Sequence, residues 1–498
     1  MVLLLFTAFA ILIHGYHFGI EDQAIYLPGI KKNLNPALYP HDSELFLPQT
    51  RPTLIDEVAA WAVKATQMPV EWAVLLWHVV SIFAVLLGCY RLASRCFASE
   101  RARLGALSLV TALLTIPVAG TALYMADQYL HPRALATAFI LSAVAEVLGH
   151  AKRRWVIAVL WFFAAATVHV QMAFFGGLLL ILLAAPLEKL MPSRTQPAAY
   201  ALLLTPLSTF FQPASPEWRE AMLTRSAHFL LRWEWYEWLG VVAPIAVLWW
   251  FSRIARRTSS PDMEKLSRTL VFYSAFTLVV AIVTTVPPRF ERLTPYQPLR
   301  AFHLVYLLMF LMAGGLIAEF VLKAKVWRWL VLFVPLCGGM FYAQRELFPG
   351  SPHIEWPGVA PTNEWVQAFE WVRHNTPQGA YFAMDPHYLS SPREDYHGFR
   401  GIAERSQMAD WDKDPGVVTL FPAAAPAWHR QVHALDDWAR FGTADFQRLK
   451  TDFGVNWIIL ALKEAGGTSS DAPEGQNTAP EGMDCPYQNA SVRVCNLR

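Results

Sequence analysis

Runs of about 18 or more predominantly apolar residues recur along the chain, and they limit what it can fold into. Each run is long enough to cross a bilayer core of about 30 Å as a helix. Hydrophobic residues make up 54% of the chain and charged residues only 16%, whereas soluble domains average about 25% charged residues. The sequence therefore predicts a polytopic α-helical membrane protein embedded in a lipid bilayer.

We expect about eleven membrane spans. Their approximate limits are 1–16, 72–92, 104–124, 132–150, 155–169, 171–187, 197–212, 236–254, 267–286, 300–322 and 326–343.

Lysine and arginine set the expected orientation, because loops rich in these residues stay on the cytoplasmic side. The basic loops are Arg91–Arg103, Lys152–Arg154, Glu188–Arg194, Arg253–Arg268 and Lys323–Arg328. They alternate with loops poorer in base at 17–71, 125–131, 213–235 and 287–299. We expect this second set, and everything after about residue 344, to face outward. A net charge of +2 gives no reason to expect a nucleic acid partner.

The pattern of apolar residues changes near residue 344. Apolar runs shrink to strand length at 380–384 and 455–462, and helical patterns lie at 363–374, 427–441 and 443–453. The Gly-, Ser- and Pro-containing stretch 466–482 is typical of a mobile loop. We therefore predict a transmembrane domain, 1–343, with the long first outward loop 17–71. A soluble extracytoplasmic α/β domain, 344–498, follows.

Cysteines in this exported part favour a disulfide. Cys485 and Cys495 lie ten residues apart and flank a predicted hairpin, and an oxidising compartment allows them to pair. Cys89, Cys96 and Cys337 lie in or beside apolar runs, where a thiol usually behaves as a small hydrophobic group.

Two adjacent carboxylates, Glu21 and Asp22, come just after the first apolar run. A charged pair at a membrane surface is costly to desolvate and often marks function; the alternative is a solvated start of a loop. Further candidates share an expected position at the outer membrane face: His41, Asp42, Asp127, His131, Arg133, His169 and Arg300. Arginines at such an interface bind phosphate through two parallel hydrogen bonds, and a carboxylate can take a proton from an attacking hydroxyl.

Several of these candidates also have a purely structural explanation. His41 and Asp42 could cap a helix. Arg133 could extend its charge toward the lipid headgroups, and His169 could end a helix.

The chain resembles the GT-C superfamily of integral-membrane glycosyltransferases. The resemblance rests on the short first span, the early acidic pair, the Asp in the second outward loop, the many spans and the outer C-terminal domain. More closely, Gly-Ile-Glu-Asp-Gln (19–23), Leu-Tyr-Pro-His-Asp (38–42), Gln-Pro-Leu-Arg (297–300) and Ala-Glu-Arg-Ser (403–406) look like an uncharacterised bacterial branch. So does the segment 364–377, and the likeness covers essentially the whole chain.

This resemblance implies transfer of a sugar from a polyprenyl-phosphate carrier to an acceptor at the outer face of a bacterial inner membrane. The matching motif implies that Asp22, with Glu21 beside it, is the base or orients the acceptor. It also implies that Asp127 corresponds to the acidic residue that the family carries in the second outward loop. Many members have Asp-Glu or Asp-Asp where this chain has Glu-Asp, so either Glu21 or Asp22 could be the base. The sequence gives no positive reason for a metal, and we expect no cofactor, but dependence on a divalent metal stays open.

Two other functions stay open at this point. Charges within a helix bundle also mark transporters or lipid flippases, although we find no internal repeat. A non-catalytic relative could bind a partner through its outer domain. If the chain is a transferase, we expect Arg300 to face a central cavity on the side of Asp22 and to grip the phosphate of the donor.

Overall fold

The computed structural model describes residues 1–185, 214–390, 395–462 and 483–497. These residues form two compact units. The helical unit comprises the described residues of Met1–Gly15, Leu76–Ser215 and Ser226–Ala343, and the sheet unit comprises those of Tyr16–Leu75, Pro216–Arg225 and Gln344–Arg498. The last segment of the sheet unit begins at Gln344. Residues Tyr16–Leu75, which include the expected first outward loop, belong to the same unit.

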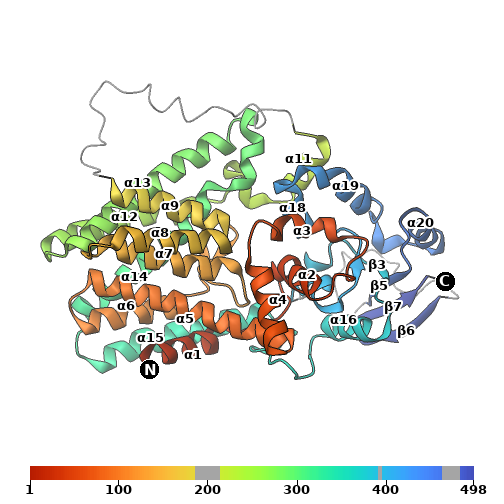
Figure 1. The fold of residues 1–498 in the computed structure, drawn as a ribbon, viewed down its shortest axis with the longest axis horizontal. Coiled ribbons are helices and arrows are strands. Elements are labelled where there is room, and N and C mark those ends of the chain that lie inside the picture. Colours follow the sequence, from red (N-terminus) through yellow and green to blue (C-terminus); the bar gives the residue numbers. More distant parts are fainter. Residues whose placement is uncertain (186–213, 391–394, 463–482, 498) are drawn as a thin grey trace. The chain divides into compact units, whose positions relative to one another are not determined.

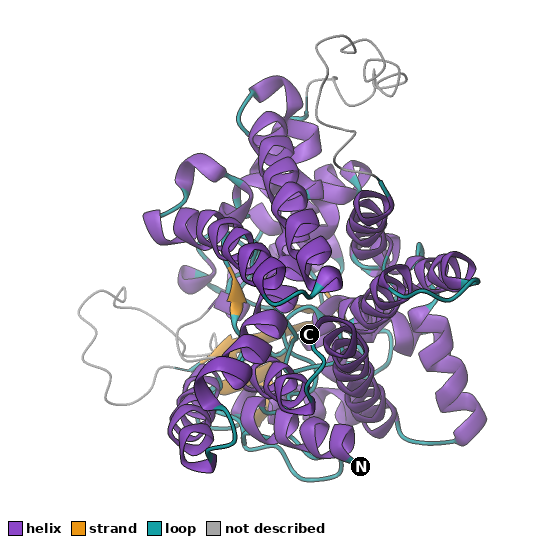
Figure 2. Ribbon diagram, turned by 90° about the vertical axis from the view of Figure 1, so that its left-hand side faces the viewer, coloured by secondary structure: helices purple, strands orange, loops and turns teal. Residues whose placement is uncertain are grey.

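The helical unit follows the apolar runs of the sequence. Its helices are α1 (Val2–His14), α5 (Val70–Cys96, whose first residues belong to the sheet unit), α6 (Glu100–Ala112), α7 (Pro132–Leu148), α8 (Arg154–Val168), α9 (Val170–Ala184), α12 (Trp235–Arg257), α13 (Pro261–Thr285), α14 (Phe302–Ile317) and α15 (Val326–Leu347). Shorter elements connect them: η4 (Ser226–His228), η5 (Leu230–Arg232), η6 (Pro288–Tyr296), η7 (Pro298–Ala301) and the π-helical turn η8 (Ala318–Leu322). Helices dominate the ribbon in Figure 2.

The expected count of about eleven spans is not confirmed. Five described segments are long and apolar enough to cross a membrane: Val70–Cys96, Trp235–Arg257, Pro261–Thr285, Pro288–Leu322 and Val326–Leu347. The apolar helices α1, α8 and α9 are shorter. The expected span 197–212, the loop Glu188–Arg194 and the stretch 466–482 lie outside the described residues. By length and composition, the five segments make the chain an integral membrane protein.

One predicted span is wrong in its second half. The run 104–124 is helical only as far as Ala112, the last residue of α6. The strands β1 (Pro117–Val118) and β2 (Leu123–Tyr124) then pair antiparallel. Proline lacks the amide hydrogen that a continuing helix needs, so Pro117 favours ending the helical run before it.

Small residues allow helices α6 and α14 to approach closely (Figure 1). A Cβ atom on Gly105 would lie 2.7 Å from the carbonyl oxygen of Gly314, and one on Gly314 would lie 2.4 Å from that of Gly105. Membrane helices pack through such small side chains because lipid offers no hydrophobic drive for association. The glycine pair therefore fixes how near these two backbones lie.

The sheet unit is built around five strands in the order β4-β3-β5-β7-β6. They are β3 (Tyr381–Ala383), β4 (Ser406–Gln407), β5 (Trp457–Ala461), β6 (Asp484–Gln488) and β7 (Val492–Asn496). Strand β3 pairs parallel with β4 and β5, whereas β7 pairs antiparallel with β5 and β6. The residue pairs Phe382–Trp457 and Ile459–Val494 fix the register around the central strand β5.

Alternating side chains give this sheet two apolar faces. Phe382, Trp457 and Ile459 pack with α16 (Glu364–Asn375) on one face. Ile458 and Leu460 pack on the other face with α20 (Thr443–Phe453). Successive side chains of a strand point to opposite sides, so both faces are covered, as an α/β domain requires. Figure 1 shows α16 and α20 on opposite sides of the strands.

Further helices complete the sheet unit. They are α2 (Gln23–Leu34), α3 (Leu47–Thr50), α4 (Ile55–Thr66), α11 (Pro216–Leu223), α17 (Phe399–Ala403), α18 (Asp414–Leu420) and α19 (Ala425–His433), with the turns η1 (Ser43–Leu45), η9 (Tyr388–Ser390), η10 (Pro422–Ala424) and η11 (Trp438–Arg440).

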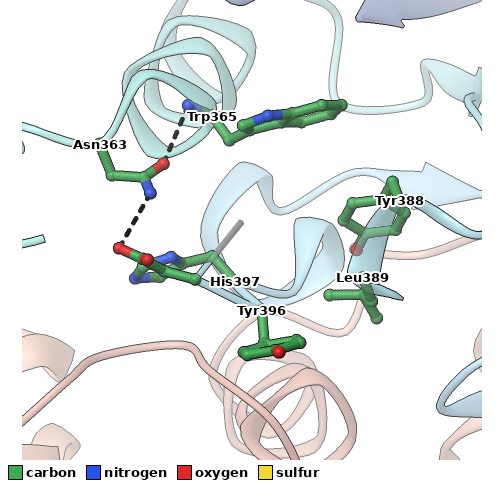
Figure 3. Close-up of a pocket in the computed structure, with 7 residues that line it drawn as sticks. Asn363, Trp365, Tyr388, Leu389, Tyr396 and His397 are labelled. Atoms are coloured by element: carbon green, nitrogen blue, oxygen red, sulfur yellow. Dashed lines mark hydrogen bonds between the residues drawn. The ribbon is translucent and has the colours of Figure 1, made fainter. Parts of the chain in front are cut away.

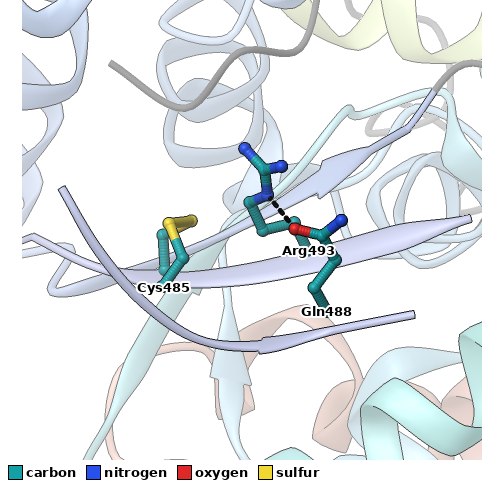
Figure 4. Close-up of a disulfide and its surroundings, with 4 residues drawn as sticks. Cys485, Gln488 and Arg493 are labelled. Atoms are coloured by element: carbon teal, nitrogen blue, oxygen red, sulfur yellow. Dashed lines mark hydrogen bonds between the residues drawn. A yellow bond between two sulfur atoms is a disulfide. The ribbon is translucent and has the colours of Figure 1, made fainter. Parts of the chain in front are cut away.

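A disulfide joins Cys485 of β6 to Cys495 of β7 (Figure 4). Beside it, the Nε atom of Arg493 donates a hydrogen bond of 2.8 Å to Oε1 of Gln488. Both contacts join the two strands of the C-terminal hairpin, so they hold the strand at the edge of the sheet onto its neighbour.

Candidate active site

The acidic pair lies in the sheet unit, at the start of helix α2. Glu21 has a left-handed backbone with φ of 50°, which is uncommon for a residue other than glycine. Its amide donates a hydrogen bond to the carbonyl oxygen of Tyr396. Asp22 is the N-cap residue of α2, although no capping hydrogen bond from its side chain is present. A backbone held in such a conformation is often associated with functional sites.

Lys413 is the cationic partner of this pair. Its Nζ atom forms a short ion pair with Oε2 of Glu21 and lies 3.6 Å from Oδ1 of Asp22. The Lys413 side chain is 12% exposed, whereas Glu21 and Asp22 are 34% and 37% exposed. Burial lowers the pKa of Lys413, but the two carboxylates outweigh burial and raise it. The lysine therefore stays charged and holds two solvent-accessible carboxylates together.

Asp410 shapes the loop that presents Lys413. Its Oδ1 atom accepts hydrogen bonds from the backbone amides of Asp412, Lys413 and Asp414. Its carbonyl oxygen accepts another from Nε1 of Trp428 at 2.9 Å. This loop leads into α18. Hydrogen bonds to the side chain of Asp410 and to its carbonyl oxygen hold the backbone of the loop in place.

Arg400 supports the same loop from the protein interior. It donates hydrogen bonds of 2.8 and 2.9 Å to the two carboxylate oxygens of Asp414, and one of 2.6 Å to Oδ2 of Asp42. All three side chains are almost fully buried. A buried charge is tolerated only when it is paired and hydrogen-bonded, so these contacts explain how the guanidinium can lie there.

Arg225 adds a second cation beside the loop. Its Nη2 atom donates a hydrogen bond of 3.1 Å to the carbonyl oxygen of Lys413. The same nitrogen would lie 2.5 Å from a Cβ atom on Gly416. Gly416 therefore leaves the space that the guanidinium occupies.

Glu355 anchors the segment that precedes the acidic pair. Its Oε1 atom lies 3.1 Å from Nδ1 of His17 and 3.1 Å from Nε2 of His397, and Oε2 accepts the amide of Phe18 at 2.9 Å. Burial acts to raise the pKa of Glu355, but the two imidazoles hold it well below its usual range. An ionised Glu355 thus fixes the backbone that leads to Glu21.

A small pocket borders this anchor (Figure 3). It is lined by Asn363, Trp365, Tyr388, Leu389, Asp395, Tyr396 and His397. The Asn363 amide donates to Oδ2 of Asp395 at 3.2 Å, while its Oδ1 accepts the backbone amides of Trp365 and Val366 at the start of α16.

The other predicted residues of the sheet unit have different surroundings. Asp42 is buried beneath the loop as a partner of Arg400. His41 is exposed, and its ring stacks on Tyr381 with centroids 4.7 Å apart. Contact of either residue with a substrate stays a prediction.

The remaining predicted residues form a polar cluster in the helical unit. Arg133 Nη2 donates hydrogen bonds of 2.7 Å to both carboxylate oxygens of Asp127, and both side chains are buried. His131 caps α7 and His169 caps α9, with their rings stacked at 5.9 Å. Arg133 is therefore not a side chain that reaches toward lipid headgroups.

Arg300 is only partly buried in the helical unit. Its Nη1 atom donates a hydrogen bond of 3.2 Å to Oε1 of Gln171. Gln171 in turn donates to the carbonyl oxygen of Tyr296 at 2.7 Å. Arg300 belongs to the helical unit and Asp22 to the sheet unit, so the expected proximity of the two residues stays a prediction.

Sequence reasoning missed Lys413, Arg225 and Arg400. The pattern that could have indicated this loop is Asp-x-Asp-x-Asp followed by Pro-Gly (410–416), which concentrates charged residues within the C-terminal part of the chain. In the structure Asp410 binds backbone amides and Asp414 binds Arg400, so these two carboxylates act within the fold.

Comparison with known proteins finds similarity in structure but not in sequence. No protein-family model matches the chain, and no curated protein matches it in sequence. The chain is similar to the archaeal oligosaccharyltransferase AglB from Archaeoglobus fulgidus, solved in complex with an inhibitory peptide and a dolichol-phosphate. The match covers 92% of this chain and 69% of that chain, at 12% sequence identity and a TM-score of 0.46.

Proposed function

We propose that the chain is a membrane glycosyltransferase that moves a sugar from a polyprenyl-phosphate donor to an acceptor outside a bacterial inner membrane. The observation that carries this proposal is the cluster of Glu21, Asp22 and Lys413. It combines two accessible carboxylates with a largely buried ammonium in one fixed arrangement. Such a cluster can accept a proton and orient a hydroxyl or amide nucleophile.

The proposed reaction has one bond forming and one bond breaking. The acceptor nucleophile attacks the anomeric carbon of the sugar, and its proton passes to Asp22. The bond between that carbon and the carrier phosphate breaks, and its electron pair leaves on the phosphate oxygen. Arg300 stabilises the negative charge there, because a guanidinium keeps its proton and presents a fork of N–H donors.

Lys413 has a positioning role in this scheme. Its ammonium keeps Glu21 and Asp22 side by side although like charges repel. The ammonium offsets one of the two negative charges, so one carboxylate's charge is left uncompensated within the cluster and can attract the proton of the nucleophile. The sugar and the acceptor are not specified by these residues.

Replacement of Asp22 tests the proposal. Asp22→Asn should lower transfer from a lipid-linked sugar by about a hundred- to ten-thousandfold, the usual contribution of a general base. Glu21→Gln, assayed in parallel, decides which carboxylate is the base. The measurement is the turnover of purified protein with a polyprenyl-phosphate sugar and extracts that supply the acceptor.

Asp452→Asn is the matched control, because Asp452 is an exposed aspartate of α20 in the same unit. It should keep wild-type turnover. Full activity of Asp22→Asn at equal expression would remove Asp22 as the base. Full activity of both carboxylate variants would overturn the proposed role of the cluster.

A further inference from the structure

A second cluster of chemically active side chains lies outside the acidic pair. His429 and His433 stand four residues apart on α19, so they share one face of that helix. Glu220 of α11 faces both: its Oε2 lies 3.1 Å from Nε2 of His429, and its Oε1 lies 2.6 Å from Nε2 of His433. The ligand atoms all lie within 4.8 Å of one another.

The donor set selects a class of metal ion. Two imidazole nitrogens and one carboxylate oxygen suit zinc and neighbouring transition metals, whereas calcium and magnesium prefer oxygen ligands alone. A His-x-x-x-His pair on one helix with a carboxylate from elsewhere is a recurrent zinc arrangement. The three side chains are 29–38% exposed, so a metal ion can reach them from solvent.

Asp436 orients one of the imidazoles. Its Oδ2 atom lies 2.6 Å from Nδ1 of His433, which leaves Nε2 to face Glu220. A carboxylate on the far nitrogen of a metal-binding histidine fixes the ring and raises its basicity. The cluster thus has the supporting contact that metal-binding histidines usually have.

We propose that Glu220, His429 and His433 bind a divalent transition-metal ion, zinc by preference, and that this ion fastens α11 to α19. Helix α11 is also held at Trp218, whose Nε1 donates to the carbonyl oxygen of Thr419 at 3.1 Å. Arg225 follows α11 and contacts the carbonyl oxygen of Lys413. A metal bridge would therefore stabilise the segment that carries Arg225 to the Lys413 loop.

Zinc binding can be measured without any sugar donor. The full-length protein, purified in detergent and stripped with a chelator, should take up zinc stoichiometrically in calorimetric titration. The double variant His429→Ala/His433→Ala should bind zinc about a hundredfold or more weakly, and Asp436→Asn about ten- to hundredfold more weakly. Bound Co²⁺ should give the visible absorption of a site with nitrogen ligands.

The controls separate this site from adventitious binding. His374→Ala removes an exposed histidine of α16 and should leave zinc affinity unchanged. Glu220→Gln keeps the shape of the side chain but should weaken binding, and it guards against a folding defect in the double variant. No zinc uptake by the wild type, or equal uptake by the double variant, would overturn the site. Because no transfer is assayed, either result leaves the glycosyltransferase proposal intact.

Discussion

At the level of single residues, ion pairing and burial decide which charged side chains can contact a substrate. Arg133 and Asp127 are buried and bind each other, so each neutralises the other inside the helical unit. Arg300 is only partly buried and donates to a neutral amide of Gln171. Because Arg300 is partly exposed and Arg133 is buried, Arg300 is the more accessible of the two arginines and the one we propose to bind an anionic donor.

Substitution of Arg300 tests that role. Arg300→Ala should weaken donor binding by about ten- to hundredfold, because hydrogen bonds to charged groups contribute about 1.5–3 kcal/mol. Arg300→Lys should weaken it less, since it keeps the charge and loses the fork. Binding of a polyprenyl-phosphate analogue to the purified protein measures both.

Gln171→Ala is the control for Arg300. It removes the same hydrogen bond but leaves the guanidinium in place, so donor affinity should stay close to wild type. Unchanged affinity in Arg300→Ala would make Arg133 the next candidate for the phosphate clamp.

At the scale of elements, helices α2 and α4 pack tightly around a buried acid. Asp56 of α4 is 2% exposed, and a Cβ atom on Gly29 of α2 would lie 2.5 Å from its Oδ2. Burial, with a smaller contribution from Glu57, raises the pKa of Asp56 to about 7. An ionised Asp56 is thus unfavourable in the folded state near neutral pH.

The difference between the folded and unfolded pKa values of Asp56 determines how the free energy of unfolding changes with pH. The folded pKa lies above the unfolded value of about 3.9, so ionisation favours unfolding. This destabilisation is absent below the unfolded pKa and complete above the folded pKa of about 7. Asp56→Asn should therefore gain stability relative to wild type as pH rises from about 5 to 8, by roughly 2–4 kcal/mol.

Thermal unfolding of both proteins in detergent at several pH values measures that difference. Asp452→Asn, at an exposed position, should show no comparable trend. A difference between Asp56→Asn and wild type that stays constant or shrinks with rising pH would contradict the raised pKa.

In the whole molecule, each compact unit is built from segments that lie far apart in the sequence. The sheet unit gathers the first long loop, a ten-residue segment at Pro216–Arg225 and the C-terminal part. The acidic pair and Lys413 therefore belong to one unit although about 390 residues separate them in sequence. Because these segments fold together, we expect all of them to lie on the same side of the membrane.

Thiol labelling tests the outward orientation. In a variant with Cys89, Cys96 and Cys337 replaced by serine, Cys485 and Cys495 should react with a membrane-impermeant maleimide on intact spheroplasts only after reduction. The disulfide blocks them before reduction. Labelling that requires permeabilised membranes would place the sheet unit in the cytoplasm, and labelling without reductant would contradict the disulfide.

Features that depend on neighbouring residues can be predicted from the amino-acid sequence alone. Apolar runs of membrane-span length indicated the described helices of the helical unit, shorter apolar runs indicated β3 and β5, and helical patterns indicated α16 and α20. Such patterns can be recognised because a strand covered on both faces is apolar throughout, whereas a helix buried on one face repeats its apolar residues every three to four positions. The same reasoning failed at 113–124, where the apolar residues continue but the helix does not.

The pairing of charged side chains from distant parts of the chain depends on the tertiary fold. Asp42 was a candidate for substrate binding, yet the fold places it beneath Arg400, 358 residues away. Lys413 reached the acidic pair, and Glu220 reached two histidines of α19, through packing that no local pattern records. Ion pairs between distant segments depend on how whole elements stack against a common core, so periodicity along the chain carries no information about them.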